Sequence, residues 1–589
     1  MPTDQDVQTA LEAVHGGRAA RDLESERLDF KTVGRSVSDT LSDLAEAVAC
    51  FANHHGGTVV VGVRDRPGGP DAFVGCAPLD AGRTRHAIFE RTEPPLTTDV
   101  AELTFHGTPL LVITVPEGAT VHSVSGRHTQ RVGTSCMPMT ADRIARLVAD
   151  RRGDDWTDEP TSVPASAVDP LAMTTARQFL RNATDPTRRA FAELSDDDLL
   201  RTLGLVTPDG TLNRAGTLLL VDDPHARAHT AYVHRRTPAG ELTANEQLSG
   251  PIVTTLARVF DLISARTDTT SIDVSPLVQV QVADLPATAI REALVNAVMH
   301  RDYRDSARIA VEHTATRLAV TSPGPFVSGV TTSNVLTTAS RSRNPRLAEA
   351  IRKLGLGETA GMGVDRMYAA MARLGHQPPQ FDADGSTVRV TLTGGAPNAH
   401  VARFVQSLPE GSADDADTML TLLSLLHSRV VNAAGLSPVL QKPPTEVQAV
   451  LDRLAAPPFD LVEPTRETVR NVHPNYRLRE AALRGLGTAV TYRRRTTDSV
   501  DARVLDLLQE TGTINARMVR LIIETDASTT SRILGDMVER GLLVKTSAAT
   551  RGPGVTYGPG PKVPAGRKRR AGRAAPSEPE STLFEGDEG

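Results

Sequence analysis

The segment from Pro286 to Met367 constrains the fold most narrowly, because helical and strand patterns alternate in it in a fixed order. PATAIREALVNAVMHRDY has the apolar spacing of a helix, and RIAVEHTATRLAVTSPG has the composition of two strands joined by a turn. A helical run, RNPRLAEAIRKLGLGE, and a GMG loop follow. This order predicts helices packed on a sheet, and we place that unit at residues 169–395.

The first helix of this segment carries polar residues with a possible catalytic spacing. Glu292 and Asn296 are four residues apart and therefore share one helical face. A carboxylate can act as the general base of an ATPase, and an amide oxygen can ligate a phosphate-bound Mg²⁺. His300 and Asp302 extend this polar face. The ExxxN spacing alone is more typical of an ordinary amphipathic helix, so the later segments decide between the two interpretations.

Two glycine segments follow the strand pattern. SPGPF places Gly324 in a tight turn, and GMGVDRM places Gly361 and Gly363 ahead of a helix that contains Arg366. Glycines let backbone N–H groups approach phosphates, and a helix N-terminus favours anions. A single GxG is more often a plain turn or helix cap, but the complete order of segments favours a nucleotide pocket.

This order resembles the histidine-kinase-like (GHKL) ATPases over residues 170–395. The resemblance implies that Glu292 and Asn296 serve Mg-ATP, that Gly324 lies near the adenine, and that Gly361 and Gly363 surround the phosphates. The Asp-x-Gly-x-Gly adenine motif of the family reads SPGPF here, so the acidic adenine contact is missing. The sequence has no GxxxxGK[ST] loop, which disfavours a helicase motor.

Residues 1–150 have a mixed α/β pattern. A helix is predicted over Val37–Ala52, TVVVGV and PLLVITV read as buried strands, HTQRVG reads as an edge strand, and a last helix is expected over Ala141–Arg151. The run LESERLDFK contains Glu24 and Asp29, and Asp65 ends the strand VVVGVRD. Three carboxylates at strand ends could hold a metal that cleaves phosphodiesters, although such acids are more often solvated surface.

The motifs ESERLDFK, AVACFANHHGG, TVVVGVRD and QRVGTS resemble the Schlafen AlbA domain over residues 20–150. The resemblance implies nucleic-acid binding, with Lys31 and Arg131 as phosphate contacts. The acidic triad of the nuclease members falls on Glu24, Asp29 and Asp65, with Asp29 where the family more often has Glu. The central unit similarly resembles the ATP-binding domain of bacterial Schlafen AlbA proteins labelled RecG-like helicases or transcriptional regulators.

Composition limits where the chain can carry out these functions. The formal net charge is −6, so any basic, nucleic-acid-binding surface must be local. Cys50, Cys76 and Cys136 form no CxxC pair, which excludes a zinc site of the usual spacing and fits a reducing cytoplasm. The N-terminus lacks a signal-peptide pattern, and no run approaches the ~18 apolar residues of a membrane helix. We therefore expect a soluble cytoplasmic protein without a membrane partner.

The remaining segments are predicted to be a linker, two winged helices and a tail. Residues 151–168 have linker composition, and residues 400–490 and 498–560 read as winged-helix modules. In the second module Ser528, Thr530 and Arg532 would open a recognition helix, although such modules also serve in dimerisation or packing. The tail, residues 561–589, carries GRKRR and is expected to be disordered.

The combined prediction is a multidomain α+β protein that binds ATP with Mg²⁺ and binds DNA or RNA. The first hypothesis is a transcriptional regulator or ATP-gated switch. The alternative is a nuclease in phage defence that uses Mg²⁺ or Mn²⁺ at Glu24, Asp29 and Asp65. A third interpretation is a scaffold without ATP binding. Schlafen-type domains often pair and one is visible here, so we expect at least a homodimer.

Overall fold

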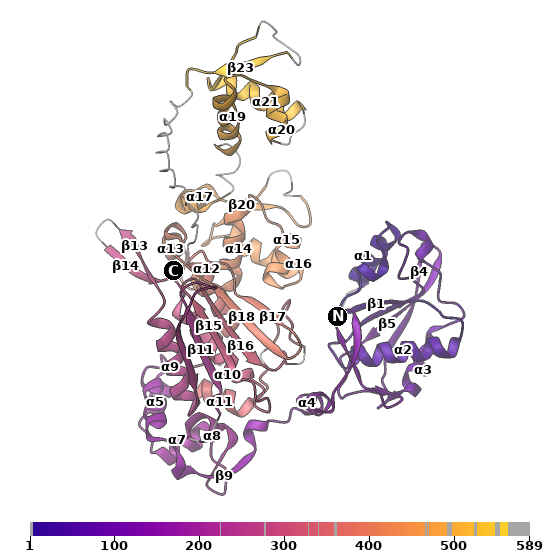
Figure 1. Cartoon of the computed structure of the whole chain (residues 1–589), viewed down its shortest axis with the longest axis vertical. Helices are drawn as coiled ribbons and strands as arrows, with labels where there is room; N and C mark the ends of the chain where they lie inside the picture. The colour runs from indigo at the N-terminus through magenta and orange to yellow at the C-terminus, as the bar shows by residue number, and fades with distance from the viewer. Residues whose placement is uncertain are drawn as a thin grey trace, which may run out of the picture. The chain divides into compact units, whose positions relative to one another are not determined.

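The computed structural model of the chain divides into two compact units, Met1–Ala489 and Val490–Gly589 (Figure 1). The first unit contains an N-terminal α/β part, a central α/β part and a helical part. The structure describes residues 4–223, 225, 227–275, 278–327, 329–339, 341–357, 362–465, 468, 470–491, 498–523, 527–547 and 554–562.

The N-terminal part is built on a four-stranded sheet with the order β1-β2-β5-β4. β1 and β2 are parallel, and the other neighbours are antiparallel. Successive strand residues point to opposite faces, so Val59 and Val61 join a core with helices α2 and α3, whereas Val60 joins a core with α1. The elements are α1 (Asp4–His15), β1 (Leu28–Lys31), α2 (Val37–Ala52), β2 (Gly57–Val61), α3 (Ala81–Arg91), β4 (Asp99–Phe105) and β5 (Thr108–Val115).

The predicted helix over Val37–Ala52 is confirmed with the same bounds, and its N-cap Ser36 accepts a hydrogen bond from the backbone of Asp39. The strand predicted in HTQRVG is confirmed over Thr129–Val132. β7 (Thr129–Val132) pairs with β8 (Ser135–Pro138) in a separate hairpin and does not join the four-stranded sheet. A short polar strand pattern does not identify the strand with which it pairs.

A disulfide between Cys50 and Cys136 ties this hairpin to α2, with the two Cα atoms 5.9 Å apart. The third cysteine, Cys76, is a buried free thiol. The two bonded residues are separated by 86 positions, so no spacing signal in the sequence announced the pair. Disulfides are rare in a reducing compartment. The bond therefore does not support the cytoplasmic location expected from the cysteines, and that location stays a prediction.

The predicted linker over residues 151–168 is largely packed against the central part. After α4 (Ala141–Arg152), the carboxylate of Asp158 accepts a hydrogen bond from Arg346 Nε at 2.7 Å. β9 (Pro160–Pro164) then pairs antiparallel with β10 (Thr211–Asn213). The linker prediction is wrong for these residues, because Pro, Ser and Thr also suit a half-exposed edge strand.

The central part is a sandwich of helices on a six-stranded sheet with the order β12-β11-β15-β16-β18-β17. β11 and β15 are parallel, and the other neighbours are antiparallel. One apolar core joins the sheet to the surrounding helices. The strands are β11 (Thr230–Arg235), β12 (Leu242–Leu248), β15 (Ile309–Thr314), β16 (Arg317–Pro323), β17 (Gln380–Ala383) and β18 (Thr387–Thr393), and a separate hairpin contains β13 (Thr269–Ser275) and β14 (Val278–Ala283). The helices are α5 (Pro170–Arg181), α6 (Pro186–Phe191), α7 (Asp196–Leu203), α8 (Arg214–Leu220), α9 (Ile252–Ser264), α10 (Ala287–His300), α11 (Pro345–Lys353) and α12 (Gly363–Arg373).

The apolar run TLLL, residues 217–220, lies in helix α8, although its composition also fits a buried strand. Asn213 is the N-cap of this helix, and its side-chain oxygen accepts a hydrogen bond from Gly216 N at 2.9 Å. Its amide also donates to Gly204 O at 2.9 Å. A short apolar run fits a buried helix as well as a buried strand, and here the cap selects the helix.

Helices dominate the C-terminal segments. The first segment contains α13 (Ala399–Gln406), α14 (Ala416–His427), α15 (Ala433–Leu440), α16 (Pro444–Ala455), β19 (Val462–Pro464), β20 (Tyr476–Leu478) and α17 (Glu480–Leu486). The second unit contains α19 (Asp498–Thr511), β21 (Ile514–Asn515), α20 (Ala516–Ile523), α21 (Ala527–Glu539), β22 (Leu543–Lys545) and β23 (Thr556–Pro559). Three helices followed by a hairpin is the order expected of a winged helix, and that assignment stays a prediction.

The GRKRR run lies outside the described residues. Throughout the described part of the chain, every helix is too short or too polar to cross a bilayer.

We predict that Asn213→Ala lowers the free energy of unfolding of the central part by about 1–2 kcal/mol, because α8 loses its N-cap. Urea unfolding followed by tryptophan fluorescence measures this change. The single tryptophan of the chain, Trp156, lies under the Arg214 guanidinium of α8, 4.3 Å from the ring centroid. Asn182→Ala, at an exposed helix end, is the control and should change stability by less than about 0.5 kcal/mol. An equal loss in the free energy of unfolding for Asn213→Ala and Asn182→Ala would contradict the role of the cap.

Candidate functional site

A cavity of about 150 Å³ lies between α10, α12 and the sheet of the central part. Four residues that were predicted to contact ATP line this one cavity: Glu292, Asn296, Gly324 and Gly363. Apolar side chains from three neighbouring strands complete the lining, namely Val320, Phe381, Val388 and Val390. The structure therefore brings together motif residues that lie up to 71 positions apart in sequence, from Glu292 to Gly363. They share the cavity with the apolar side chains of the strands. The fifth predicted residue, Gly361, lies outside the described residues.

Gly363 approaches the Glu292 carboxylate closely. A Cβ atom at Gly363 would lie 2.6 Å from Glu292 Oε2 and 4.0 Å from Asn296 Nδ2. Any larger residue would therefore displace the carboxylate, which is only 2% exposed. Gly363 is also the first residue of α12, so the positive end of that helix opens at the cavity beside Asn296.

Gly324 is constrained in a different way. Its φ of 104° lies in the left-handed region that favours glycine, and a Cβ there would collide with the Arg343 guanidinium. The preceding Ser322 donates its hydroxyl to Ala297 O at 2.7 Å, which ties β16 to α10. The SPG turn thus borders the cavity while its own geometry is set by packing against an arginine.

Sequence reasoning did not identify the basic side chains of this cavity. Arg341 and Arg352 both line it, and Arg352 Nε is buried without a hydrogen-bond partner among the described residues. His300 also lines the cavity, and burial, followed by the charges of Arg343 and Arg352, lowers its pKa to about 4. His300 is therefore neutral near pH 7, and the arginines are the cations available to an anionic ligand. The basic run RSRNPR was the available signal for Arg341, whereas Arg352 lies outside that run.

In the N-terminal part, two of the three predicted acidic residues are adjacent. Asp29 is 2% exposed and pairs with Lys31 Nζ at 2.9 Å and with Arg131 Nη2 at 3.5 Å. Glu24 is hydrogen-bonded to Asp29, and its pKa is raised to about 7 by burial first and by Asp29 second. The pair therefore carries less negative charge than two free carboxylates would.

The third acid, Asp65, is exposed on the loop after β2. Within the described ranges, one group of three or more His, Cys, Asp or Glu residues has its ligand atoms all within 4.8 Å of one another, and it consists of Glu12, His15 and His106. Asp65 therefore does not complete such a group with Glu24 and Asp29 in this structure.

The predicted phosphate contacts also differ in exposure. The Arg131 guanidinium is buried, donates to Ser25 O at 3.1 Å, and stacks on the Phe51 ring, 4.7 Å from its centroid. It thus holds the β7–β8 hairpin against β1 and is not available to a phosphate, whereas the Lys31 side chain is 38% exposed. Of the predicted recognition-helix residues, Thr530 is fully buried, whereas Ser528 and Arg532 are exposed on α21.

We predict that the raised pKa of Glu24 makes the N-terminal part less stable as the pH rises. Its folded-state pKa of about 7 exceeds the ordinary value of 4.5, so the folded state binds the proton more tightly. The resulting stabilisation is present below pH 4.5 and is lost as the pH rises through 7. Glu24→Gln should remove this dependence, and the exposed control Glu46→Gln should retain it. Hydrogen exchange of peptides that span β1, between pH 5 and pH 8, measures this pH dependence of stability. The same pH response in both variants would contradict the assignment.

Comparison with known proteins gives three findings. Residues 24–140 match the family model described as "Schlafen, AlbA_2", and residues 306–392 match the model described as "Putative ATP-dependent DNA helicase recG C-terminal". The crystal structure of the DIP2311 protein from Corynebacterium diphtheriae shares 28% identity with a TM-score of 0.51, covering 79% of this chain and 94% of that chain. No curated protein matches. The second match begins after Asn296, so the positions of Glu292 and Asn296 rest on the cavity geometry. The chain therefore contains a Schlafen AlbA domain and an ATPase-like domain.

Proposed function

We propose that this protein binds Mg-ATP in the cavity between α10 and α12 and binds nucleic acid through its AlbA domain. In this proposal it acts as an ATP-gated switch of the transcriptional-regulator type. One observation carries the proposal: Glu292, Asn296, Gly324 and Gly363, which sequence reasoning selected for ATP, all line a single cavity.

The residues of the cavity fit the parts of a nucleotide. The Asn296 amide oxygen would ligate Mg²⁺, and the Glu292 carboxylate would orient a water molecule. The N-terminus of α12 and the Arg352 guanidinium would neutralise phosphate charge. The apolar strand residues would cover the adenine. The Ser322 hydroxyl, in the turn that usually bears the adenine-binding acid, is already bonded to Ala297 O.

Contacts from the C-terminal helices support a gating role. Residues Val330, Val335, Thr338 and Ala339 of one segment line the cavity. Gln441, which follows α15, accepts a hydrogen bond from Leu336 N at 2.9 Å and donates one to Thr332 O at 3.1 Å. A nucleotide that moves this segment would therefore act on the helical part through the Gln441 amide.

A second candidate function is metal-dependent cleavage of nucleic acid, and the adjacent Glu24 and Asp29 carboxyl groups favour it. The Glu24 carboxyl lies close enough to Asp29 for a hydrogen bond that raises its pKa, and this proximity supports a shared ligand. Binding of Mg²⁺ or Mn²⁺ would require Glu24 to lose its proton and Asp29 to compete with its partners Lys31 and Arg131. The exposed Asp65 would have to approach from its loop.

We predict that wild-type protein binds Mg-ATP and that Asn296→Ala binds it about 10–100-fold more weakly, because a charge-assisted ligand is lost. Isothermal titration calorimetry measures this. Arg352→Met should also weaken binding, whereas Lys353→Met is the matched control, since Lys353 Nζ pairs with Glu349 and Thr202 O outside the cavity. Absence of binding by the wild-type protein would overturn the proposal.

For the second candidate, labelled RNA and DNA incubated with Mn²⁺ or Mg²⁺ should be cleaved by the wild-type protein and not by Glu24→Gln or Asp65→Ala. Loss of one metal-held carboxylate removes a ligand and raises the barrier, so a loss of at least about 100-fold in rate is expected. Glu46→Ala, at an exposed position of α2, should cleave normally. Intact protein that binds nucleic acid without cutting it would favour the switch over the nuclease.

A further inference from the structure

Two sequence motifs near the cavity have no role in the ATP chemistry described above. They are the HRDY motif at the end of α10, which contains Asp302, and the RNP motif at the start of α11, which contains Arg343 and Asn344. Asp302 is 5% exposed and Asn344 is 2% exposed. Asn344 donates to Met299 O at 3.0 Å and to Arg301 O at 2.8 Å, so it joins the RNP motif to the end of α10. Together the motifs form a polar platform.

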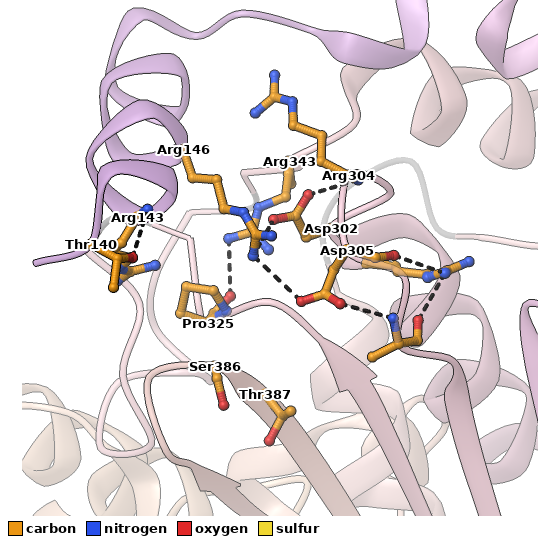
Figure 2. A network of polar contacts seen from close by, with 12 residues as sticks. Thr140, Arg143, Arg146, Asp302, Arg304, Asp305, Pro325, Arg343, Ser386 and Thr387 are labelled. Carbon is orange, nitrogen blue, oxygen red and sulfur yellow. Dashed lines mark hydrogen bonds and ion pairs between the residues drawn. The ribbon is translucent and has the colours of Figure 1, made fainter.

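Helix α4, which follows the AlbA domain, docks on this platform. Arg146 Nη1 lies 3.5 Å from Asp302 Oδ2 and 3.4 Å from Asp305 Oδ2. Figure 2 shows Arg146 reaching from α4 toward these two carboxylates, with Arg343 beside them. One turn further along α4, Asp150 Oδ2 lies 3.6 Å from Arg343 Nη2. Arg146 and Asp150 are four residues apart and therefore face the platform together.

Other side chains of α4 bind the AlbA domain. Arg143 Nε donates to Gln130 Oε1 of β7 at 3.1 Å. Arg151 Nη2 donates to Ala52 O, at the end of α2, at 2.7 Å. The same short helix is thus fixed by polar contacts to the AlbA domain and to the ATPase-like domain.

Arg343 also borders the nucleotide cavity. Its Nη2 donates to Pro325 O at 3.0 Å, and its Nη1 donates to His300 O at 3.3 Å. Pro325 and His300 both line the cavity, and the Arg343 side chain is 7% exposed. Its partners therefore lie in a poorly hydrated site, where loss of one partner has a larger effect than at the surface. A movement of the SPG turn would disturb the same guanidinium that holds Asp150.

We propose that α4 couples the nucleotide cavity to the AlbA domain. This coupling rests on the proposed ATP binding. A bound nucleotide shifts the SPG turn and, through it, the side chain of Arg343. This shift changes the ion pairs of Arg343 with Asp150 and of Arg146 with Asp302 and Asp305. Helix α4 transmits the change to the end of α2 and to β7. Reciprocally, a ligand bound to the AlbA domain changes ATP affinity by the same factor.

Trp156 provides a reporter at the platform. It is the single tryptophan of the chain, and its ring is stacked with that of Tyr303 at a centroid distance of 6.1 Å. Tyr303 follows Asp302 directly, and Trp156 lies beside Asp150, Arg343 and Asn344. Its fluorescence therefore responds to a rearrangement of the platform.

The experiment uses the full chain. Calorimetry establishes Mg-ATP binding for wild type, Arg146→Ala, Arg146→Lys and Arg152→Ala. Arg152 is an exposed arginine of the same helix and serves as the matched control. Trp156 fluorescence and hydrogen exchange of peptides over 118–132 and 141–152 are then compared with and without saturating Mg-ATP.

We expect Mg-ATP to change the fluorescence of the wild-type protein and to change exchange in both peptides about fivefold or more. In Arg146→Ala, ATP should still bind, but the response at residues 118–132 should be lost. Arg146→Lys should restore part of that response, and Arg152→Ala should behave as wild type. ATP binding without any response at residues 118–132, or an equal response in Arg146→Ala, would overturn the coupling. Absence of ATP binding by wild type would overturn the proposed function itself, and calorimetry separates the two failures.

Discussion

The nucleotide cavity depends on two glycines that pack directly against charged side chains. Gly363 leaves space for the buried Glu292 carboxylate, and Gly324 leaves space for the Arg343 guanidinium. A side chain at either position would displace the charged group, and a buried charge without its partners is costly. The two close approaches therefore fix where α12 meets α10 and where the SPG turn meets the RNP motif. Both of these junctions border the cavity.

In the AlbA domain, charged side chains form ion pairs that join neighbouring elements. Asp29 lies between Lys31 and Arg131, and Arg131 bridges β1 and the β7–β8 hairpin through Ser25 O and Asp29. The Cys50–Cys136 disulfide fastens the same hairpin to α2. Residues that would be prominent on a nucleic-acid-binding surface thus take part in holding three elements together. Lys31 is the more exposed member of this group.

The ATPase-like domain is contacted from both directions along the chain. Residues of α4 pair with Asp302 and Arg343 of the platform and with the neighbouring Asp305. Gln441 is hydrogen-bonded to the segment that lines the cavity. Both sets of contacts involve backbone or side chains that border the proposed nucleotide site. This arrangement supports a switch more readily than an independent enzyme, because movement at the cavity would disturb contacts to both neighbouring parts.

Local periodicity in the sequence determined α2, α10, the strands β15 and β16, and the i, i+4 placement of Glu292 and Asn296. Those features depend on residues a few positions apart, so the hydrophobic pattern and the capping residues were sufficient to predict them. Only the tertiary structure decided that the linker carries β9, that residues 217–220 are helical, that Arg131 is buried and that Arg352 lines the cavity. Each of these depends on partners far away in the chain, such as Asp29 for Arg131, and the sequence pattern around a residue does not encode which distant surface covers it.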